Sequence, residues 1–309
     1  MIPPKRHHYL PQFYLGGFCR EDKLWVFDRE KKEFRQQTPK NTAVKTHYYS
    51  VEEKDGGMRT EIETMLSYIE SYAKQVIDKL LLREVITEDE KQTLSIFIAF
   101  MMNRVPDFEK SVNTIEKHTI QLMADMMFSD EKRVQAMMNE QERNTGEKSD
   151  VSAKELVDFH KRRQYEIVIN RNESLRLMLT TSMELSKYFR LMDWGIYHAP
   201  PKKSFITTDN PLILVPPVEY KPGFFGIGII TKGARKVLPL SQKACLIMFD
   251  RGDLLVHRDA DMHLVRNINL SLTSRADRFV IGCDETLIRN LVRTTKLTEW
   301  ERKGRISIG

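Results

Sequence analysis

TEDEKQTLSIFIAFMMNRVP, residues 87–106, carries the signals for both ends of one helix. Thr87 and Glu90 form a capping box, in which the threonine side chain accepts a backbone N–H and the glutamate reaches back. From Leu94 to Met101 nearly every side chain is apolar, which predicts the central helix of a bundle, buried on all sides. The helix should end before Pro106, because the residue preceding a proline disfavours helical geometry.

The same reasoning extends the helical region in both directions. Residues 62–80 keep a three-four spacing of apolar side chains and predict a helix with one buried face. A Met-rich helix should follow Pro106 and run through Met127, with its methionines filling a core. Residues 141–150 are polar and are expected to form a loop. Ser152 and Glu155 form a second capping box that should open a helix to about Val168, and another helix is predicted over 173–191.

Strands are predicted on both sides of this helical region. Their composition and alternation place them at residues 23–28, 33–37 and 46–51 and, after Trp194, at 194–198, 204–208, 212–215, 235–240, 244–249 and 278–283. Two helices are expected among the later strands, over 261–276 and from Asp284 to about Thr295.

The order of these elements predicts an α+β fold. We expect an N-terminal β segment over 1–57 that packs on the C-terminal sheet, a helical region over 58–192 and an α/β region over 193–309. Because the N-terminal strands should return to the C-terminal sheet, one core is expected rather than independent domains.

Composition excludes several classes of protein. The chain has 309 residues, of which 41% are hydrophobic and 30% charged, as in ordinary globular proteins. Its sequence holds no apolar run long enough to span a membrane and its start does not resemble a signal peptide. Three widely spaced cysteines without a CxxC pair argue against a cysteine zinc site and favour reduced thiols. We therefore expect a cytoplasmic protein that is not bound to a membrane.

The charge distribution bears on possible partners. The formal net charge is +6, and residues 231–309 alone hold fifteen Lys and Arg against nine Asp and Glu. A basic region of this kind suits phosphate-bearing partners such as a nucleic acid or a nucleotide. Ordinary scatter of charge over a solvated surface would give the same excess, so both interpretations stay open.

The opening segment, KRHHYLPQFYLGGF at 5–18, could carry chemistry. His7 or His8 could act as a general base or as a ligand, although adjacent residues do not form a ready metal pair. Arg6 could bind a phosphate. The alternative is that the aromatic residues pack into the core and the histidines bond to backbone groups.

A second segment, Phe205-Ile-Thr-Thr-Asp-Asn-Pro211, places Asp209 and Asn210 at the end of a strand. Asp209 could bind a divalent metal or orient a histidine. A simple Asx turn would need the same residues.

Three further residues are candidate phosphate or nucleic-acid contacts. Arg104 ends the most apolar helix, where it needs either a carboxylate partner or an anion. Arg266 and Asn267 give a weaker signal. The sequence leaves the identity of any metal or cofactor unknown.

These motifs together resemble the bacterial domain of unknown function 4238 family. The residues that carry the resemblance run from His7-His8-Tyr9-x-Pro11-Gln12-Phe13-Tyr14-Leu15 through Leu24–Arg29, Phe97–Ala99, Arg104-x-Pro106, Phe205–Pro211, Pro239–Ser241 and Asn267-x-Asn269. The resemblance implies that the two polar segments define the family, and it implies no activity. The family resembles proteins that occur sporadically in bacteria, as cargo of defence systems or mobile elements does.

Three hypotheses follow from the sequence. The first is a nucleic-acid or nucleotide-binding module of a bacterial defence or mobile-element system. The second is a nuclease-like phosphodiesterase, a hydrolase in which His7 or His8, Asp209 and Asn210 form the catalytic site. It requires these residues to lie within about one side-chain length of each other. The third is a structural or protein-interaction subunit, whose sign would be a large exposed apolar patch.

Overall fold

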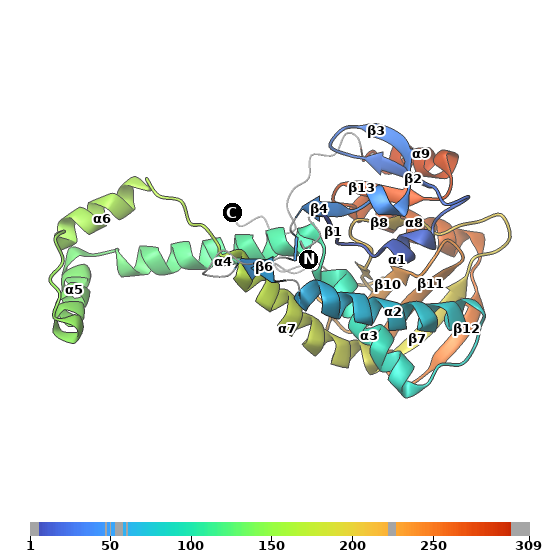
Figure 1. Ribbon diagram of the computed structural model, residues 1–309, viewed down its shortest axis with the longest axis horizontal. Helices are drawn as coiled ribbons and strands as arrows, with labels where there is room; N and C mark the ends of the chain where they lie inside the picture. Colours follow the sequence, from blue (N-terminus) through green and yellow to red (C-terminus); the bar gives the residue numbers. More distant parts are fainter. Residues whose placement is uncertain are drawn as a thin grey trace. The chain divides into compact units, whose positions relative to one another are not determined.

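A computed structural model describes residues 6–46, 48–49, 51–52, 58–59, 61–221 and 227–297. Two compact units divide the chain (Figure 1). Unit 1 combines residues 1–109 with 175–309, and unit 2 consists of residues 110–174. The helices expected over residues 62–105 and most of the helix expected over residues 173–191 therefore belong with the strands, while residues 110–174 form a unit of their own.

Unit 1 contains two main sheets. A five-stranded sheet has the order β12-β7-β11-β10-β9, in which β12 and β7 are parallel and the other pairs antiparallel. Its strands are β7 (Met192–His198), β9 (Ile213–Val215), β10 (Arg235–Pro239), β11 (Ala244–Arg251) and β12 (Leu255–Asp259). The β12 strand was not predicted from the sequence.

The second sheet joins the two ends of the chain. Its order is β3-β2-β13-β8, and all its pairs are antiparallel. The strands are β2 (Leu24–Asp28), β3 (Glu33–Gln37), β8 (Thr207–Thr208) and β13 (Phe279–Gly282). In this sheet Val26 lies opposite Ile281, so an N-terminal strand pairs with one from the C-terminal region. The predicted α+β class is confirmed.

Two small pairs of strands and a 3-10 turn lie in the N-terminal part. The strand β1 (Arg6–His8) pairs with β4 (Val44–Thr46), and β5 (Val51–Glu52) pairs with β6 (Met58–Arg59). A 3-10 turn, η1 (Pro39–Asn41), precedes β4. The strand predicted over 46–51 includes His47 and Ser50, which lie outside the described residues.

Unit 1 contains α1 (Gln12–Gly16), α2 (Glu61–Leu81), α3 (Glu88–Asn103), α8 (Met262–Arg275) and α9 (Glu285–Thr294), together with most of α7 (Arg171–Arg190). All of these helices except α1 were predicted from the sequence. The α3 helix has the predicted capping box between Thr87 and Glu90, and α9 has the predicted cap at Asp284. Side chains from Leu94 to Met101 bury α3 in a core that also includes Trp194 of β7 and Leu246 of β11.

Unit 2 departs from the sequence predictions. It takes most of α4 (Pro106–Met127), all of α5 (Glu131–Thr145) and α6 (Ala153–Arg162), and the start of α7 (Arg171–Arg190). Residues 141–145 are helical rather than a loop, because α5 continues until Gly146 adopts a left-handed φ of 72°. The α6 helix has the predicted capping box at Ser152 but ends at Arg162, where left-handed Arg163 follows.

The predicted burial of the Met-rich helix is wrong. Its large apolar side chains are 40–59% exposed: Ile115, Ile120, Leu122, Met123, Met126 and Met127. The small core of unit 2 is built instead from residues of α5 and α6, among them Val134, Ala153 and Val157. Spacing showed that α4 has an apolar face, but spacing does not say what covers that face.

Candidate functional site

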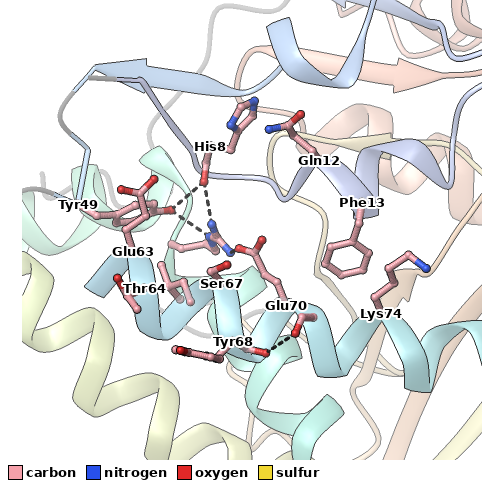
Figure 2. A pocket seen from close by; sticks show the side chains of 13 residues that line it. His8, Gln12, Phe13, Tyr49, Glu63, Thr64, Ser67, Tyr68, Glu70 and Lys74 are labelled. Atoms are coloured by element: carbon pink, nitrogen blue, oxygen red, sulfur yellow. Dashed lines mark hydrogen bonds and ion pairs between the residues drawn. The ribbon is translucent and has the colours of Figure 1, made fainter. Parts of the chain in front are cut away.

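A pocket of about 810 Å³ opens in unit 1 beside α2 (Figure 2). Its lining comes from four parts of the chain: the opening motif, Tyr49, α2 and the end of α3. The lining residues are His8, Gln12, Phe13, Tyr49, Glu63, Thr64, Leu66, Ser67, Tyr68, Glu70, Ser71, Lys74 and Arg104. This volume falls within the range of small-molecule sites, roughly 300–1,000 Å³.

Arg104 is the centre of the hydrogen bonding in this pocket. Its Nε donates to the Tyr49 hydroxyl at 3.0 Å, its Nη1 to the Glu70 carboxylate at 2.6 Å and its Nη2 to the His8 carbonyl at 2.7 Å. Burial alone would lower the pKa of Arg104, but Tyr49 and Glu70 outweigh burial and raise it. The guanidinium is therefore a permanently charged group held in a fixed orientation by three other residues.

Arg104 lies at the pocket because α3 ends at this point of the chain. It is the C-cap residue of α3, and Pro106 starts α4 two residues later. The sequence left open whether Arg104 pairs with a carboxylate or binds an anion. It pairs with Glu70, and its contacts use three of the five N–H groups of a guanidinium.

His7 is held by contacts with Tyr49 and Glu63. Its side chain is fully buried, and its Nδ1 accepts the backbone N–H of Tyr49 at 2.8 Å. The ring stacks on Tyr49 with 5.7 Å between centroids, and Nε2 lies 3.4 Å from the Glu63 carboxylate. These contacts fix the loop that carries Tyr49 against the first strand.

His8 presents its backbone to Arg104 and its ring to another partner. The ring Nε2 lies 3.1 Å from the Lys40 carbonyl, and because a carbonyl can only accept, Nε2 carries the proton. Burial lowers the pKa of His8, and the bond to Lys40 opposes this only in part. His8 is therefore neutral near pH 7, with Nδ1 as the acceptor on its ring.

The α2 wall of the pocket carries hydroxyl groups. Thr64, Ser67, Tyr68 and Ser71 follow one face of the helix, and Lys74 lies one turn further along. Ser71 donates to the Tyr68 carbonyl at 3.4 Å (Figure 2). The Tyr68 ring is 66% exposed, which leaves an aromatic surface at the mouth of the pocket.

The charges around the pocket nearly balance. Glu63 and Glu70 are acidic, while Lys74 and Arg104 are basic. Lys74 also bonds to Asp78 at 2.7 Å, in an exposed i,i+4 pair of modest strength. The site therefore suits a ligand with several hydrogen-bonding groups better than one that carries a high charge.

Asp209 lies in a buried turn and is not among the residues that line this pocket. Its two carboxylate oxygens accept the backbone N–H groups of Asp277 at 2.9 Å and Arg278 at 2.7 Å. It thereby connects the end of β8 to the turn between α8 and β13. These bonds reach residues 68 and 69 positions away along the chain, so they differ from the local bonds of an Asx turn.

Asn210 has a similar structural role. Its side chain donates to Asp107 at 3.3 Å, which connects the turn to the first turn of α4. Its backbone N–H and carbonyl both bond to the Thr208 hydroxyl. Neither Asn210 nor Asp209 is brought to the pocket that His8 and Arg104 line.

The remaining candidate residues lie on the surface. Arg6 is exposed and donates to Asn41 at 3.4 Å. Arg266 and Asn267 are exposed on α8, whereas the neighbouring Asn269 is buried and bonds to the backbone of Ser204 and Ile206. Within the part of the chain that the structure describes, no three His, Cys, Asp or Glu side chains are placed to hold a metal ion.

Among the residues that line the pocket, sequence reasoning singled out only His8 and Arg104 as site candidates. Most of the others lie on α2, where polar residues on the outer face of an amphipathic helix give no distinguishing signal. The only indication was the charge of Arg104, which required a partner somewhere.

Fold and pocket together define an α+β protein with a polar, ligand-sized pocket beside α2. A family profile described as "Protein of unknown function (DUF4238)" matches residues 6–286. The chain therefore belongs to this family, which confirms the resemblance. No curated protein and no solved structure matches the chain. Within the described residues, no helix has the length and apolar character to cross a membrane.

Proposed function

We propose that this protein binds one unpaired nucleotide, free or within a single strand, in the pocket beside α2. The observation that carries the proposal is the lining of this pocket, which combines hydroxyls of α2, the exposed Tyr68 and Lys74 with the Arg104–Glu70 pair. No residue of the pocket need act as a catalyst.

Each part of a nucleotide finds matching chemistry in this lining. A base can stack on the Tyr68 ring, because every base has a π face. Carboxylates such as Glu63 accept hydrogen bonds from the amino groups of bases, and hydroxyls such as Ser67 bond to ribose. Lys74 at the rim can meet a phosphate while the nearly neutral interior holds base and sugar.

The phosphodiesterase alternative finds no comparable support. It requires His7 or His8 to converge with Asp209 and Asn210, but the oxygens of Asp209 accept backbone N–H groups and Asn210 bonds to Asp107. The cytoplasmic location and the defence or mobile-element setting stay predictions from the sequence.

Isothermal titration calorimetry tests the proposal directly. The ligands are the nucleoside 5′-monophosphates and single-stranded RNA and DNA of about eight nucleotides. We expect binding that Tyr68→Ala weakens by about tenfold, equivalent to about 1.4 kcal/mol. Tyr72→Ala is the matched control, since Tyr72 is similarly exposed on α2 but does not line the pocket.

The outcomes separate the possible ligands. Binding of monophosphates identifies a free nucleotide, and binding of strands alone identifies a nucleic acid. Because Lys74 is the main candidate phosphate contact, we expect a salt slope near −1 on logarithmic axes. Absence of binding for every ligand, or equal loss in the two tyrosine variants, would refute the proposal. Cleavage of the strands would favour the phosphodiesterase alternative.

A further inference from the structure

The α4 helix has an apolar side that is largely exposed. Ile115, Leu122, Met123 and Met126 lie on one face of the helix and are each 49–59% exposed. Isolated exposed apolar residues are common on monomers, but contiguous patches of several hundred Å² mark interaction sites. Ile120 and Met127, which are 43% and 40% exposed, flank this face.

The opposite face of α4 already has partners within unit 2. Gln121 donates to the Tyr165 hydroxyl at 3.0 Å, and Asp125 lies 2.7 Å from Nε2 of His160. The Tyr165 hydroxyl also lies 2.9 Å from Nδ1 of His160, which closes the network. Because α6 is held by the polar side of α4, most of the apolar side stays exposed, and Val168 and Ile169 border it only near Ile115 and Ile120.

The spacing of the apolar face matches a two-helix seam. Ile115, Thr119, Leu122 and Met126 follow steps of four, three and four residues, as the d and a positions of a heptad do. Such a seam packs against another helix of the same kind. Methionine adds side chains that adapt readily to a partner surface.

A groove lies at one end of the seam. It has a volume of about 370 Å³ and is lined by Ile115, Ile120, Val168 and Ile169, with Glu116 and Glu173 at its polar edge. Met126 and Met127 lie about three turns away, at the other end of the same helix. A surface with a groove at one end and protruding side chains at the other is self-complementary under a two-fold axis.

For two copies of α4 that pack along this seam, the charges near its ends favour an antiparallel arrangement. Arg133 is exposed, and its guanidinium donates to the Met126 carbonyl at 2.7 Å, so it sits at the C-terminal end of α4. An antiparallel partner would bring Glu116 of a second copy to that end, where opposite charges meet. A parallel partner would bring together two Arg133 side chains.

We propose that the open face of α4 pairs with the same face of a second copy of this chain, antiparallel and two-fold. The axis passes between residues 120 and 121, so Met126 packs on Ile115 of the second copy and Thr119 packs on Leu122 of the second copy. The surface is an interface independent of the nucleotide pocket.

Sedimentation velocity across a concentration series tests the pairing. We expect wild type to form a dimer whose dissociation constant rises at least ~100-fold in Leu122→Glu, because each dimer would bury two unpaired carboxylates. Leu254→Glu is the matched control, because Leu254 is 64% exposed elsewhere in the chain. Thr119→Leu fills a seam position and should tighten the dimer by about tenfold.

Three results would overturn the dimer. They are a monomeric wild type at about 100 µM, a dimer that Leu122→Glu leaves intact, and equal weakening by Leu254→Glu. Circular dichroism of each variant confirms that folding is unchanged, as expected for substitutions at exposed positions.

Cysteine cross-linking tests the orientation. Under mild oxidation, a mixture of Ile115→Cys and Met126→Cys proteins should form a cross-linked dimer that neither variant forms alone. Wild type under the same oxidant controls for the three native cysteines. Self-cross-linking of each single variant would instead show a parallel pair and reject the two-fold axis between residues 120 and 121.

Discussion

The Arg104 cluster and the Asp209 turn are built from residue types that often act in catalysis, yet they differ in what their polar groups face. Arg104 is buried among Tyr49, Glu70 and the His8 carbonyl, and it also lines an open pocket. Asp209 and Asn210 are buried, with their side chains bonded to other parts of the chain. The first arrangement can meet a ligand, whereas the second holds elements together.

This difference shows why residue type alone is a poor guide to a site. An Asp or Asn at a strand end serves equally well as a ligand or as the anchor of a turn. What distinguishes the two cases is whether the group also borders a cavity. Variants should therefore separate effects on stability from effects on ligand binding.

The largest expected effect comes from breaking the Arg104 cluster. Arg104→Met leaves Glu70 without its charged partner and should lower the free energy of unfolding by about 3 kcal/mol, measured by urea denaturation. It should also abolish nucleotide binding, because the floor of the pocket is lost. The double variant with Glu70→Gln removes the unpaired charge and should recover part of the stability. A loss below about 1 kcal/mol for the single variant would contradict the role of this pair.

Asp209→Ala should lower the free energy of unfolding by about 2 kcal/mol, since it leaves two partly buried backbone N–H groups without their acceptor. Nucleotide affinity should stay within about twofold of wild type at a temperature where the variant is folded, because Asp209 does not line the pocket. Glu219→Ala, at an exposed carboxylate, is the control for stability. If Asp209→Ala lost as much nucleotide affinity as Arg104→Met, the Asp209 turn and the Arg104 cluster would be coupled. The contrast between these two regions would then be wrong.

The free energy of unfolding should depend on pH through the protonation of His8. Burial lowers its pKa in the folded state below the unfolded value of about 6.5. The unfolded state then takes up more protons as the pH falls, so the contribution of neutral His8 is complete above about pH 6.5 and is lost below it.

The expected loss from His8 is less than about 1 kcal/mol between pH 7 and 5, measured as unfolding free energy. His8→Gln should flatten part of this slope, while His118→Gln at an exposed position should not. Some slope will remain, because burial also lowers the pKa of His198 and of His257. An unchanged slope in His8→Gln would show that the ring is not held in its neutral form.

The smallest expected effect on stability comes from a variant of a pocket residue, Ser67. Ser67→Ala removes one exposed hydroxyl of the α2 wall and should change the free energy of unfolding by less than about 0.5 kcal/mol. It should nevertheless weaken nucleotide binding by about threefold to tenfold, as the loss of one hydrogen bond does. Ser129→Ala, exposed outside the pocket, should change neither quantity.

Local sequence signals determined much of the fold. The capping boxes at Thr87 and Ser152, the helix end before Pro106 and the cap at Asp284 were all predicted, because each depends on contacts within one turn of helix. The strand composition of residues 23–28 and the alternation of residues 33–37 likewise predicted β2 and β3. These signals also established the α+β class.

The covering of each face was decided by tertiary structure. Spacing showed that α3 and α4 both carry many apolar residues, and the sequence predicted both to be buried. The structure buries α3 between strands and α2 but leaves Leu122 and Met126 of α4 exposed. Burial depends on which elements meet, and that is set by contacts between residues far apart in the chain.

The division between pocket and turn was decided in the same way. The sequence by itself showed that Arg104 needs a partner and that Asp209 ends a strand. It could not show that Arg104 meets Glu70 across 34 residues, or that Asp209 meets Arg278 across 69. Long-range packing alone brings such groups together, so it fixed which polar residues border a cavity and which are enclosed within the core.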